Sequence, residues 1–427
     1  VSMIAAMKAG QSIETAETAG ISALTAQYLK RGTVGRSEEE IARFFDGIGG
    51  SFDTGAGWNA LYCQATVLRK DFDAALDVFA DLVLHPAFAA DKFPSTQARQ
   101  LAVLQAMQSY AETECELYFD QQFFTGSPYR FPAVGTAEAI KAFTADDVRD
   151  FYQRIRVGRN MVVTIAGDVD PAEVERMVKA RLASKLQPGQ PVLPPSGIAP
   201  RKVEAIEIYP RQTQKAAAVV IVGYPGTDVF DVNDRVAMDV FDTICSGYYM
   251  PRGWLHDTLR GQSLVYGVHF SGRQGLLPGY YRSEAKCEPE NATRVARLMM
   301  DLVTMGRDYA YTEQDIARAK TTILTAIEMR NQTPEVAAQM MTFHELYGLG
   351  YDFEQKSAER IRAVTADDVR RVASRFIGPP VVCITTPRPQ LLDLNELRRP
   401  YDAEALKAMR AQTPGEVHPG RTHQAPQ

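Results

Sequence analysis

An internal repeat constrains the fold of this 427-residue chain more than any other feature. The hexapeptide Thr-Ala-Asp-Asp-Val-Arg occurs at 144–149 and again at 365–370, an offset of 221 residues, or about half the chain. Thr144 and Thr365 each precede acidic residues, which is the pattern of a helix N-cap and a first turn that complements the helix dipole. A strand-like apolar run follows both copies. The repeat therefore predicts a duplicated domain.

A proline-rich stretch separates the two expected halves. Five prolines occur between 188 and 200, and each fixes φ and removes a backbone donor, so this stretch predicts an extended linker. We expect a first domain at 1–187, the linker at 188–200, a second domain at 201–395 and a polar tail at 396–427 with a short helix at 402–411. The tail lacks a packing pattern, and we expect it to be flexible or to contact a partner.

Helical and strand-like runs alternate within each half. In the first half, we expect helices at 13–31, 37–47, 71–84, 91–110 and 144–155 and strands at 1–9, 50–56, 60–68 and 160–167. In the second half, we expect strands near 203–210, 215–224, 264–272, 278–287 and 380–386 and helices near 230–246, 252–260, 289–306, 311–331, 333–347 and 365–376. Neighbouring strands followed by helices indicate an α+β fold, with a mainly antiparallel sheet packed with helices in each domain.

The composition excludes several classes of function. The formal net charge is −5 and the pI is near 5.8, so we expect no basic surface for nucleic acid or anionic lipid. No apolar run approaches the ~18–20 residues that span a bilayer, so we expect no membrane segment. The five cysteines are scattered and form no CxxC pair. We expect them to be small buried residues rather than disulfide partners or zinc ligands.

One predicted helix carries a family motif in altered form. The segment 19–33, Ala-Gly-Ile-Ser-Ala-Leu-Thr-Ala-Gln-Tyr-Leu-Lys-Arg-Gly-Thr, resembles the signature helix of the inverted zincins. These are zinc peptidases of the pitrilysin and mitochondrial-processing-peptidase type, family M16. The stretches 45–52, 81–88 and 163–169 are also similar to family patterns, and the resemblance extends to about residue 395. It implies a metallohydrolase fold in which two homologous domains form one half of a clamshell.

The resemblance also implies that the zinc site is lost. In active members the helix carries His-x-x-Glu-His, whose i, i+3 and i+4 positions share one face, and a downstream glutamate completes the ligands. In this chain Ala23 and Gln27 take the histidine positions, Ala26 the glutamate position and Gln105 that of the downstream glutamate. Methyl groups and amides neither bind zinc at about 2.0–2.3 Å nor deprotonate a water. The six histidines contain no pair at metal-ligand spacing.

In heterodimeric members, the subunit without zinc supplies an Arg/Tyr pair from its C-terminal half to the partner's site. The segment 254–268 resembles the one that carries this pair, which implies Arg260 and Tyr266 as residues that act in trans. The two stand one residue closer together here than in the family. A guanidinium and a phenol suit the oxyanion that develops during peptide hydrolysis. Alternatively, Tyr266 packs at a strand start and Arg260 caps a helix.

Two further stretches suit the binding of a peptide. The glycine-rich run 51–57 predicts a strand edge to which an extended peptide adds by backbone hydrogen bonds, with Phe52, Thr54 and Gly55 as candidates. In the second half, Tyr281 is expected to line the same cavity. The alternative is that all four residues only build their sheets.

The sequence thus predicts an inactive subunit of a heterodimeric M16 zinc metallopeptidase. It is expected to pair with a homologue that carries His-x-x-Glu-His and to complete a chamber for unfolded peptides. We expect no cofactor in this chain and zinc in the partner. Two alternatives stay open, a structural subunit like the core proteins of a respiratory complex and a stand-alone peptide-binding protein. A cryptic enzyme has no support, because no nucleophile–base pair shows a recognisable spacing.

The start of the chain leaves its compartment unknown. Val1 stands within a strand-like run, so we expect the natural N-terminus, and any targeting segment, to lie upstream. A periplasmic location fits an exported member of this family, and a cytoplasmic location is the alternative.

Overall fold

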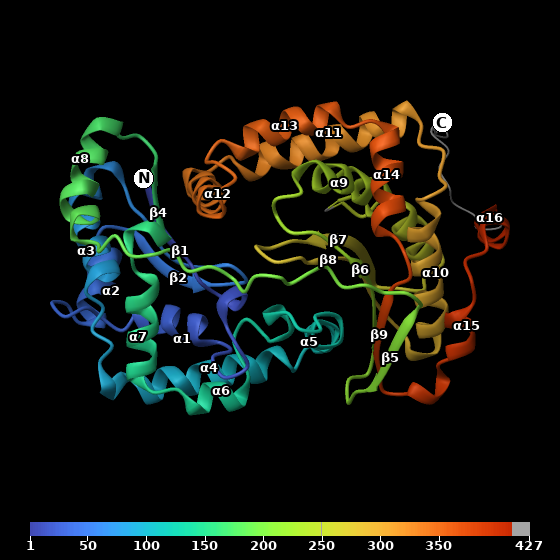
Figure 1. Cartoon of the computed structure of the whole chain (residues 1–427), viewed down its shortest axis with the longest axis horizontal. Helices are drawn as coiled ribbons and strands as arrows, with labels where there is room; N and C mark the ends of the chain where they lie inside the picture. Colours follow the sequence, from blue (N-terminus) through green and yellow to red (C-terminus); the bar gives the residue numbers. More distant parts are fainter. Residues whose placement is uncertain (249, 412–427) are drawn as a thin grey trace, which may run out of the picture.

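The computed structural model describes residues 1–248 and 250–411. Two halves lie side by side, each built on one sheet, and the linker crosses from the first half to the second (Figure 1). The strand order is β2-β3-β1-β4 in the first sheet and β5-β9-β6-β8-β7 in the second. The expected α+β architecture is confirmed. Within the described ranges, no helix is both long enough and apolar enough to span a bilayer.

The first half contains an antiparallel sheet in which β1 pairs with both β3 and β4. Its elements are β1 (Ser2–Lys8), α1 (Ile21–Leu29), α2 (Glu38–Gly47), β2 (Ser51–Ala56), β3 (Ala60–Thr66), α3 (Phe72–Leu84), α4 (Phe93–Met107), α5 (Ala111–Phe123), α6 (Ala137–Ala142), α7 (Ala145–Ile155), β4 (Met161–Ala166) and α8 (Pro171–Arg181).

The second half repeats this order of elements and adds the strand β5, which runs parallel to β9. Its elements are β5 (Glu207–Gln212), β6 (Ala218–Pro225), α9 (Val232–Ser246), a π-helical turn (His256–Arg260), β7 (Gly267–Arg273), β8 (Tyr280–Cys287), α10 (Ala292–Met305), α11 (Glu313–Arg330), α12 (Pro334–Tyr347), α13 (Phe353–Ala363), α14 (Ala366–Phe376), β9 (Val381–Thr386), α15 (Leu394–Arg398) and α16 (Ala403–Ala411).

The repeated hexapeptide opens equivalent helices in the two halves. The hydroxyl of Thr144 accepts a hydrogen bond from the backbone N–H of Asp147, whose carboxylate accepts from the N–H of Thr144 in return. Thr365 and Asp368 form the same capping box at the start of α14. These reciprocal bonds satisfy two helix-end donors each, which explains why both copies start a helix at the same residue of the repeat.

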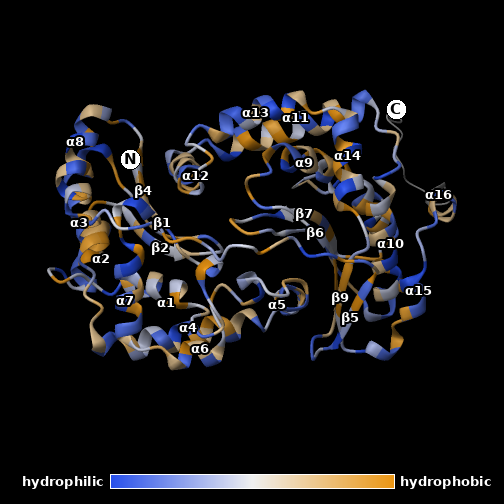
Figure 2. Cartoon of the chain, in the orientation of Figure 1, coloured by the Kyte–Doolittle hydropathy of each residue, from blue (hydrophilic) through white to orange (hydrophobic). Residues whose placement is uncertain are grey.

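Each sheet packs its outer face against helices of its own half. Buried side chains of α1, α3 and α7 form one core with the first sheet, and those of α9, α10 and α14 form another with the second. Figure 2 shows hydrophobic residues along β9 of the second sheet. All five cysteines are buried and unpaired with one another, as the sequence predicted.

The other face of each sheet is covered by a helix from the opposite half. α12 of the second half lies on β1 and β4, where Leu346 packs with Ala6 and Ala60. α5 of the first half lies on β6 and β9. Here the Phe119 ring occupies the space above Gly223, where a Cβ would lie 2.2 Å from its Cζ atom. The two halves therefore exchange helices and share buried surface.

Ion pairs extend this exchange along α5. Glu112, Glu116 and Asp120 are spaced by four residues and share the helix face that lies towards β8. Lys286 pairs with Glu112 at 2.8 Å and Arg282 pairs with Glu116 at 2.9 Å. Asp120 is only 7% exposed, and burial raises its pKa to about 7. Glu112 and Glu116, which would suggest a solvent-exposed helix face, are thus paired with basic residues of the second half.

The turn between β7 and β8 also contacts the first half. The backbone N–H of Leu276 donates to Asn59 Oδ1 at 3.0 Å, and that of Leu277 donates to the Tyr129 hydroxyl at 3.3 Å. The Arg273 guanidinium lies 4.3 Å from the Trp58 ring centroid. This contact closes the junction between the halves at a third place.

The first part of the C-terminal tail belongs to the second core. α15 and α16 pack on α10, and Leu397 and Leu406 are buried. The expected helix at 402–411 is confirmed as α16, but its apolar side packs against the domain. Residues 412–427, the rest of the predicted polar tail, lie outside the described residues.

Candidate functional site

The helix that resembles the zincin signature, α1, has a fixed N-terminus. Gly20 precedes it with φ +92°, and a Cβ there would lie 2.5 Å from the Val134 carbonyl oxygen, so only glycine fits. The Glu14 carboxylate accepts hydrogen bonds from the N–H groups of Gly20 at 2.8 Å and Ser22 at 2.9 Å. Burial raises the pKa of Glu14. The buried Glu14 carboxylate therefore caps the signature helix and fixes where it begins.

Two amides join α1 to α4. Gln27 Nε2 donates to Gln100 Oε1 at 3.1 Å. Gln100, which is fully buried, donates from Nε2 to the carbonyls of Gly20 at 2.9 Å and Val134 at 2.7 Å. This amide clasp, formed by Gln27 and Gln100, joins the two helices between which the resemblance places the zinc of active members.

The structure corrects one of the sequence-based positions. Ala23 and Gln27 are half-buried on one side of α1, and Ala26 is buried. Gln105, however, lies on the exposed side of α4, and the residue that contacts Gln27 is Gln100. The buried positions of α4 are 93, 96, 100 and 104, a helical stripe that excludes 105. That spacing was the signal in the sequence that identifies Gln100.

The residues at this position do not fit a zinc ion. Ala23 and Ala26 offer methyl groups, and the amides of Gln27 and Gln100 hydrogen-bond each other. Zinc in proteins is bound by thiolates, imidazoles and carboxylates, and none stands at these four positions. In the part of the chain that the structure describes, no three His, Cys, Asp or Glu side chains gather closely enough to hold a metal ion.

Strand β2 lies beside this helix at the edge of its sheet. Among the described strands it pairs only with β3, so its other edge can accept a further strand. Phe52 stacks on Phe45 at 5.8 Å, and the Thr54 hydroxyl donates to the Ala26 carbonyl. A Cβ on Gly55 would lie 2.6 Å from the Tyr62 hydroxyl. These side chains support the strand from within, and the backbone edge is the part that suits a peptide.

Arg260 and Tyr266 both lie on the surface of the second half. Arg260 ends the π-helical turn and is exposed. Tyr266 stands just before β7 and is 64% exposed. Its hydroxyl donates to Glu288 Oε1 at 2.7 Å, and this hydrogen bond raises the pKa of the phenol. Ser263, between them, has φ +55°, a conformation that is uncommon without glycine.

Tyr281 does not lie where the sequence placed it. Its side chain is 2% exposed and packs in the second core, 5.3 Å from Phe376 and 6.3 Å from Phe270 between ring centroids. Burial raises the pKa of its hydroxyl. Alternation along β8 turns Tyr281, Ser283 and Ala285 towards the core, so the expectation that Tyr281 lines a cavity is wrong.

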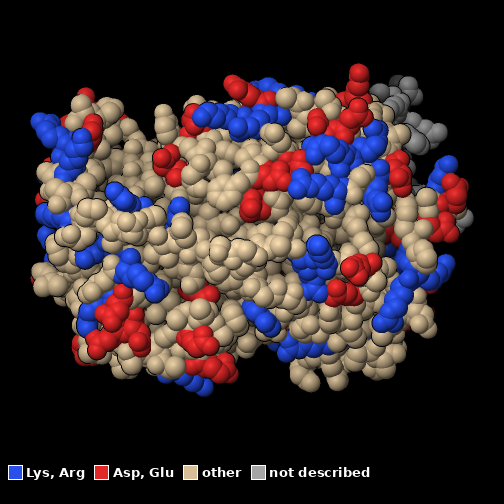
Figure 3. All heavy atoms as spheres, in the orientation of Figure 1, with Lys and Arg blue, Asp and Glu red and all other residues tan. Residues whose placement is uncertain are grey.

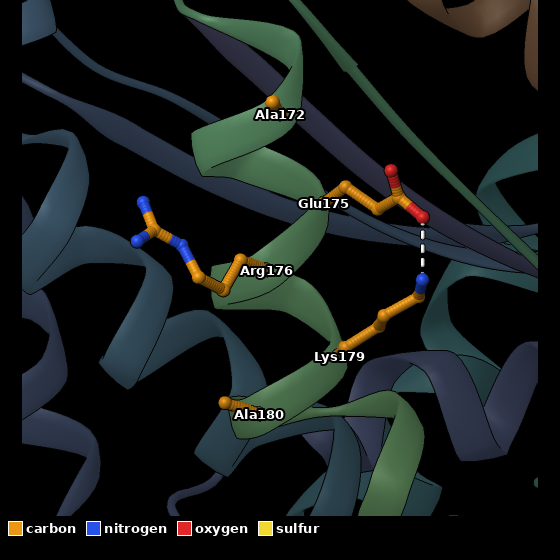
Figure 4. A pocket seen from close by; sticks show the side chains of 5 residues that line it. All are labelled: Ala172, Glu175, Arg176, Lys179 and Ala180. Atoms are coloured by element: carbon orange, nitrogen blue, oxygen red, sulfur yellow. Dashed lines mark hydrogen bonds and ion pairs between the residues drawn. The ribbon is translucent and has the colours of Figure 1, made fainter.

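Surface hollows do not supply an alternative site. One lies along the exposed side of α8, where Glu175 and Lys179 form an ion pair at 2.5 Å and Arg176 points away (Figure 4). Another lies beside α10, where Arg297 is bound to Asp301 at 2.5 Å. On the face seen in Figure 3, charges of both signs are interspersed and the middle is largely uncharged. Neither hollow contains a residue predicted for function.

The two similar α+β halves, with a signature-like helix beside the edge strand of the first, agree with the two-domain fold that the resemblance implies. The chain belongs to peptidase family M16. Residues 2–136 match the family model described as Insulinase (Peptidase family M16), and residues 142–323 match the model described as Peptidase M16 inactive domain.

The relatives of this chain include proteins that are named zinc proteases and one that is named a non-peptidase homolog. An uncharacterized zinc protease of Streptomyces coelicolor is 27% identical over 377 residues, which cover 86% of this chain and 81% of the relative. The non-peptidase homolog YmxG of Helicobacter pylori is 21% identical over 371 residues, covering 85% and 83%. The crystal structure of a peptidase M16 inactive domain from Pseudomonas fluorescens superimposes with a TM-score of 0.81 at 18% identity, covering 90% and 92%.

Proposed function

We propose that this chain is the non-catalytic subunit of a heterodimeric M16 zinc peptidase. It completes a chamber for unfolded peptides and donates Tyr266, with Arg260, to the active site of a partner that carries His-x-x-Glu-His and the zinc. The observation that carries the proposal is the amide clasp. Gln27 and Gln100 join α1 to α4 without any group that binds zinc, so the helix frame is kept while its chemistry is absent.

The segment between α9 and β7 supports a role for Arg260 and Tyr266. It contains a π-helical turn, a non-glycine residue with positive φ at Ser263, and two exposed side chains that can donate hydrogen bonds. Strained backbone conformations of this kind cost free energy that the rest of the fold must offset, and they cluster at functional sites. A phenol and a guanidinium are suitable donors to the oxyanion of peptide hydrolysis.

The open edge of β2 supports peptide binding. An extended peptide that adds to this strand gains backbone hydrogen bonds whatever its sequence, which suits unfolded substrates. The non-peptidase name of the Helicobacter pylori relative supports the absence of catalysis by such a chain alone.

Reconstitution with a zinc-bearing homologue from the same genome tests the proposal. Peptide hydrolysis is measured for each chain alone, for the mixture, and for mixtures with Tyr266→Phe or with Tyr351→Phe, a matched exposed tyrosine outside the segment. We expect activity only in the mixture, a loss of about 10²-fold with Tyr266→Phe, and no loss with Tyr351→Phe. Hydrolysis by this chain alone contradicts the proposal. An inert mixture favours the structural-subunit alternative.

A further inference from the structure

Three helices of the second half, α9, α12 and α13, meet around the side chain of Phe353 (Figure 1). The Phe353 ring is 7% exposed, and its centroid lies 4.6 Å from that of the His344 ring of α12. The guanidinium carbons of Arg235, on α9, and Arg360, on α13, lie 6.0 Å and 5.8 Å from the same centroid. Two arginines and a histidine are thus gathered around one buried ring.

Four polar atoms of this group have no hydrogen-bond partner. Arg235 Nε, His344 Nδ1 and Arg360 Nη1 are buried and unbonded. The same holds for the hydroxyl of Ser357, which lies one turn before Arg360 on α13 and is 7% exposed. Arg235 uses Nη1 to donate to the Val229 carbonyl at 2.6 Å. Within the described residues, neither arginine forms an ion pair with a carboxylate.

The nearby acidic residues leave both arginines without a counter-charge. Glu354, which follows Phe353 on α13, is paired with Arg330 at the end of α11. Asp239 lies one turn beyond Arg235 on α9 but forms no ion pair with it. Burial raises the pKa of Asp239 to about 6, although the charges of Arg235 and Arg330 act in the opposite direction. A guanidinium cannot lose its charge, so burying its N–H groups without an anion is costly.

Ordered water is the rival explanation, and it satisfies this group poorly. A water molecule accepts hydrogen bonds from donors but does not neutralise two cations. It also brings two donors of its own, which again need acceptors. An oxyanion offers several acceptor oxygens together with a negative charge, and a guanidinium binds carboxylate or phosphate oxygens by parallel hydrogen bonds.

We propose that the guanidinium groups of Arg235 and Arg360 and the hydroxyl of Ser357 form a site for a small oxyanion, phosphate or carboxylate, between α9 and α13. The His344 imidazole can supply a fourth donor from Nδ1 on α12. An anion bound here joins the three helices. Because α12 also covers β1 and β4, an occupied site should help to hold α12 on the first half. This site needs no zinc-bearing partner.

Calorimetric titration of the intact chain with inorganic phosphate, acetate and chloride at matched ionic strength tests the proposal. We expect saturable binding of phosphate or acetate, but not of chloride, and an affinity lower by at least about tenfold in Arg235→Gln and in Arg360→Gln. Arg370→Gln, an exposed arginine of α14, is the matched control and should bind like the wild type. Binding of phosphate alone identifies a phosphate site, and binding of acetate alone identifies a carboxylate site.

Two results of this titration overturn the proposal. One is the absence of saturable binding of both oxyanions to the wild type. The other is an equal affinity in the control and in the two arginine variants, once circular dichroism has shown that all of them are folded.

Asp239→Asn separates an oxyanion site from an internal ion pair. Asp239 should repel a bound anion, so its removal should raise the affinity for the oxyanion about threefold or more. If Asp239 is instead the counter-ion of Arg235, the variant loses stability and binds the anion no better, which contradicts the proposal.

NMR titration of His344 gives a readout at the site itself. Burial, with the charges of Arg235 and Arg330, lowers the pKa of this imidazole to about 4. A bound oxyanion favours the charged imidazolium, so the pKa of His344 should rise when the anion is saturating. The pKa of the surface residue His85 should stay constant. A pKa of His344 that does not change with the anion contradicts the proposal.

Discussion

At the scale of single residues, the contribution of the amide clasp to the free energy of unfolding can be measured. Gln100→Ala leaves the carbonyls of Gly20 and Val134 without their donor and Gln27 without its acceptor. We expect a loss of about 1–3 kcal/mol in the free energy of unfolding, measured with urea. Gln105→Ala, on the exposed side of the same helix, should change it by less than about 0.5 kcal/mol. Equal effects would contradict the assignment of Gln100.

Asp120 predicts a pH dependence of stability. Its folded-state pKa is about 7, above the ordinary carboxyl value, because the group is buried on the side of α5 that lies towards β8. The folded chain therefore holds a proton that the unfolded chain has already released, and stability falls as the pH rises from about 4 to 7. Asp120→Asn removes this term. Its gain in unfolding free energy over the wild type should grow between pH 5 and pH 7 and level off by pH 8; a constant difference contradicts it.

At the scale of elements, the repeated capping boxes should contribute alike. Thr144→Ala and Thr365→Ala each remove the hydroxyl that accepts the third N–H of the helix, so each should cost about 1 kcal/mol of unfolding free energy. Thr321→Ala, in the exposed middle of α11, should cost less than about half of that. A large difference between the two cap variants would argue against equivalent helices.

The same scale shows what the sequence could predict and why the rest escaped. The hexapeptide predicted α7 and α14 because a capping box is local chemistry. α5 was missed, because its acidic row of Glu112, Glu116 and Asp120 is typical of an exposed face, whereas Glu112 and Glu116 pair with residues of the other half and Asp120 is buried. Helix 13–31 was predicted too long, since Glu14 turns back as a side-chain cap and α1 begins at Ile21.

The candidate site shows a similar division. The signature helix and the segment with Arg260 and Tyr266 were identified by their resemblance to family motifs. Gln105 was chosen in place of Gln100, and Tyr281 was misplaced, because each position depends on which side of its element faces the core. Sequence resemblance fixed the family but could not fix those faces without counting helical or strand periodicity residue by residue.

At the scale of the whole molecule, the exchange of α5 and α12 predicts a single folding unit. Each sheet needs a helix of the other half to cover one face, so neither half can unfold alone without exposing apolar surface. Calorimetry of the intact chain should show one cooperative transition. Two transitions separated in temperature would show that the halves are independent domains.

The zinc content of the purified chain tests the central claim most directly. The chain is saturated with zinc, dialysed and assayed by mass spectrometry, beside a variant with Ala23→His, Ala26→Glu, Gln27→His and Gln100→Glu. The wild type should retain far less than one zinc per chain, and the variant should approach about one, because it restores the ligand types of the family on the same frame. A wild-type chain that retains one zinc contradicts the account.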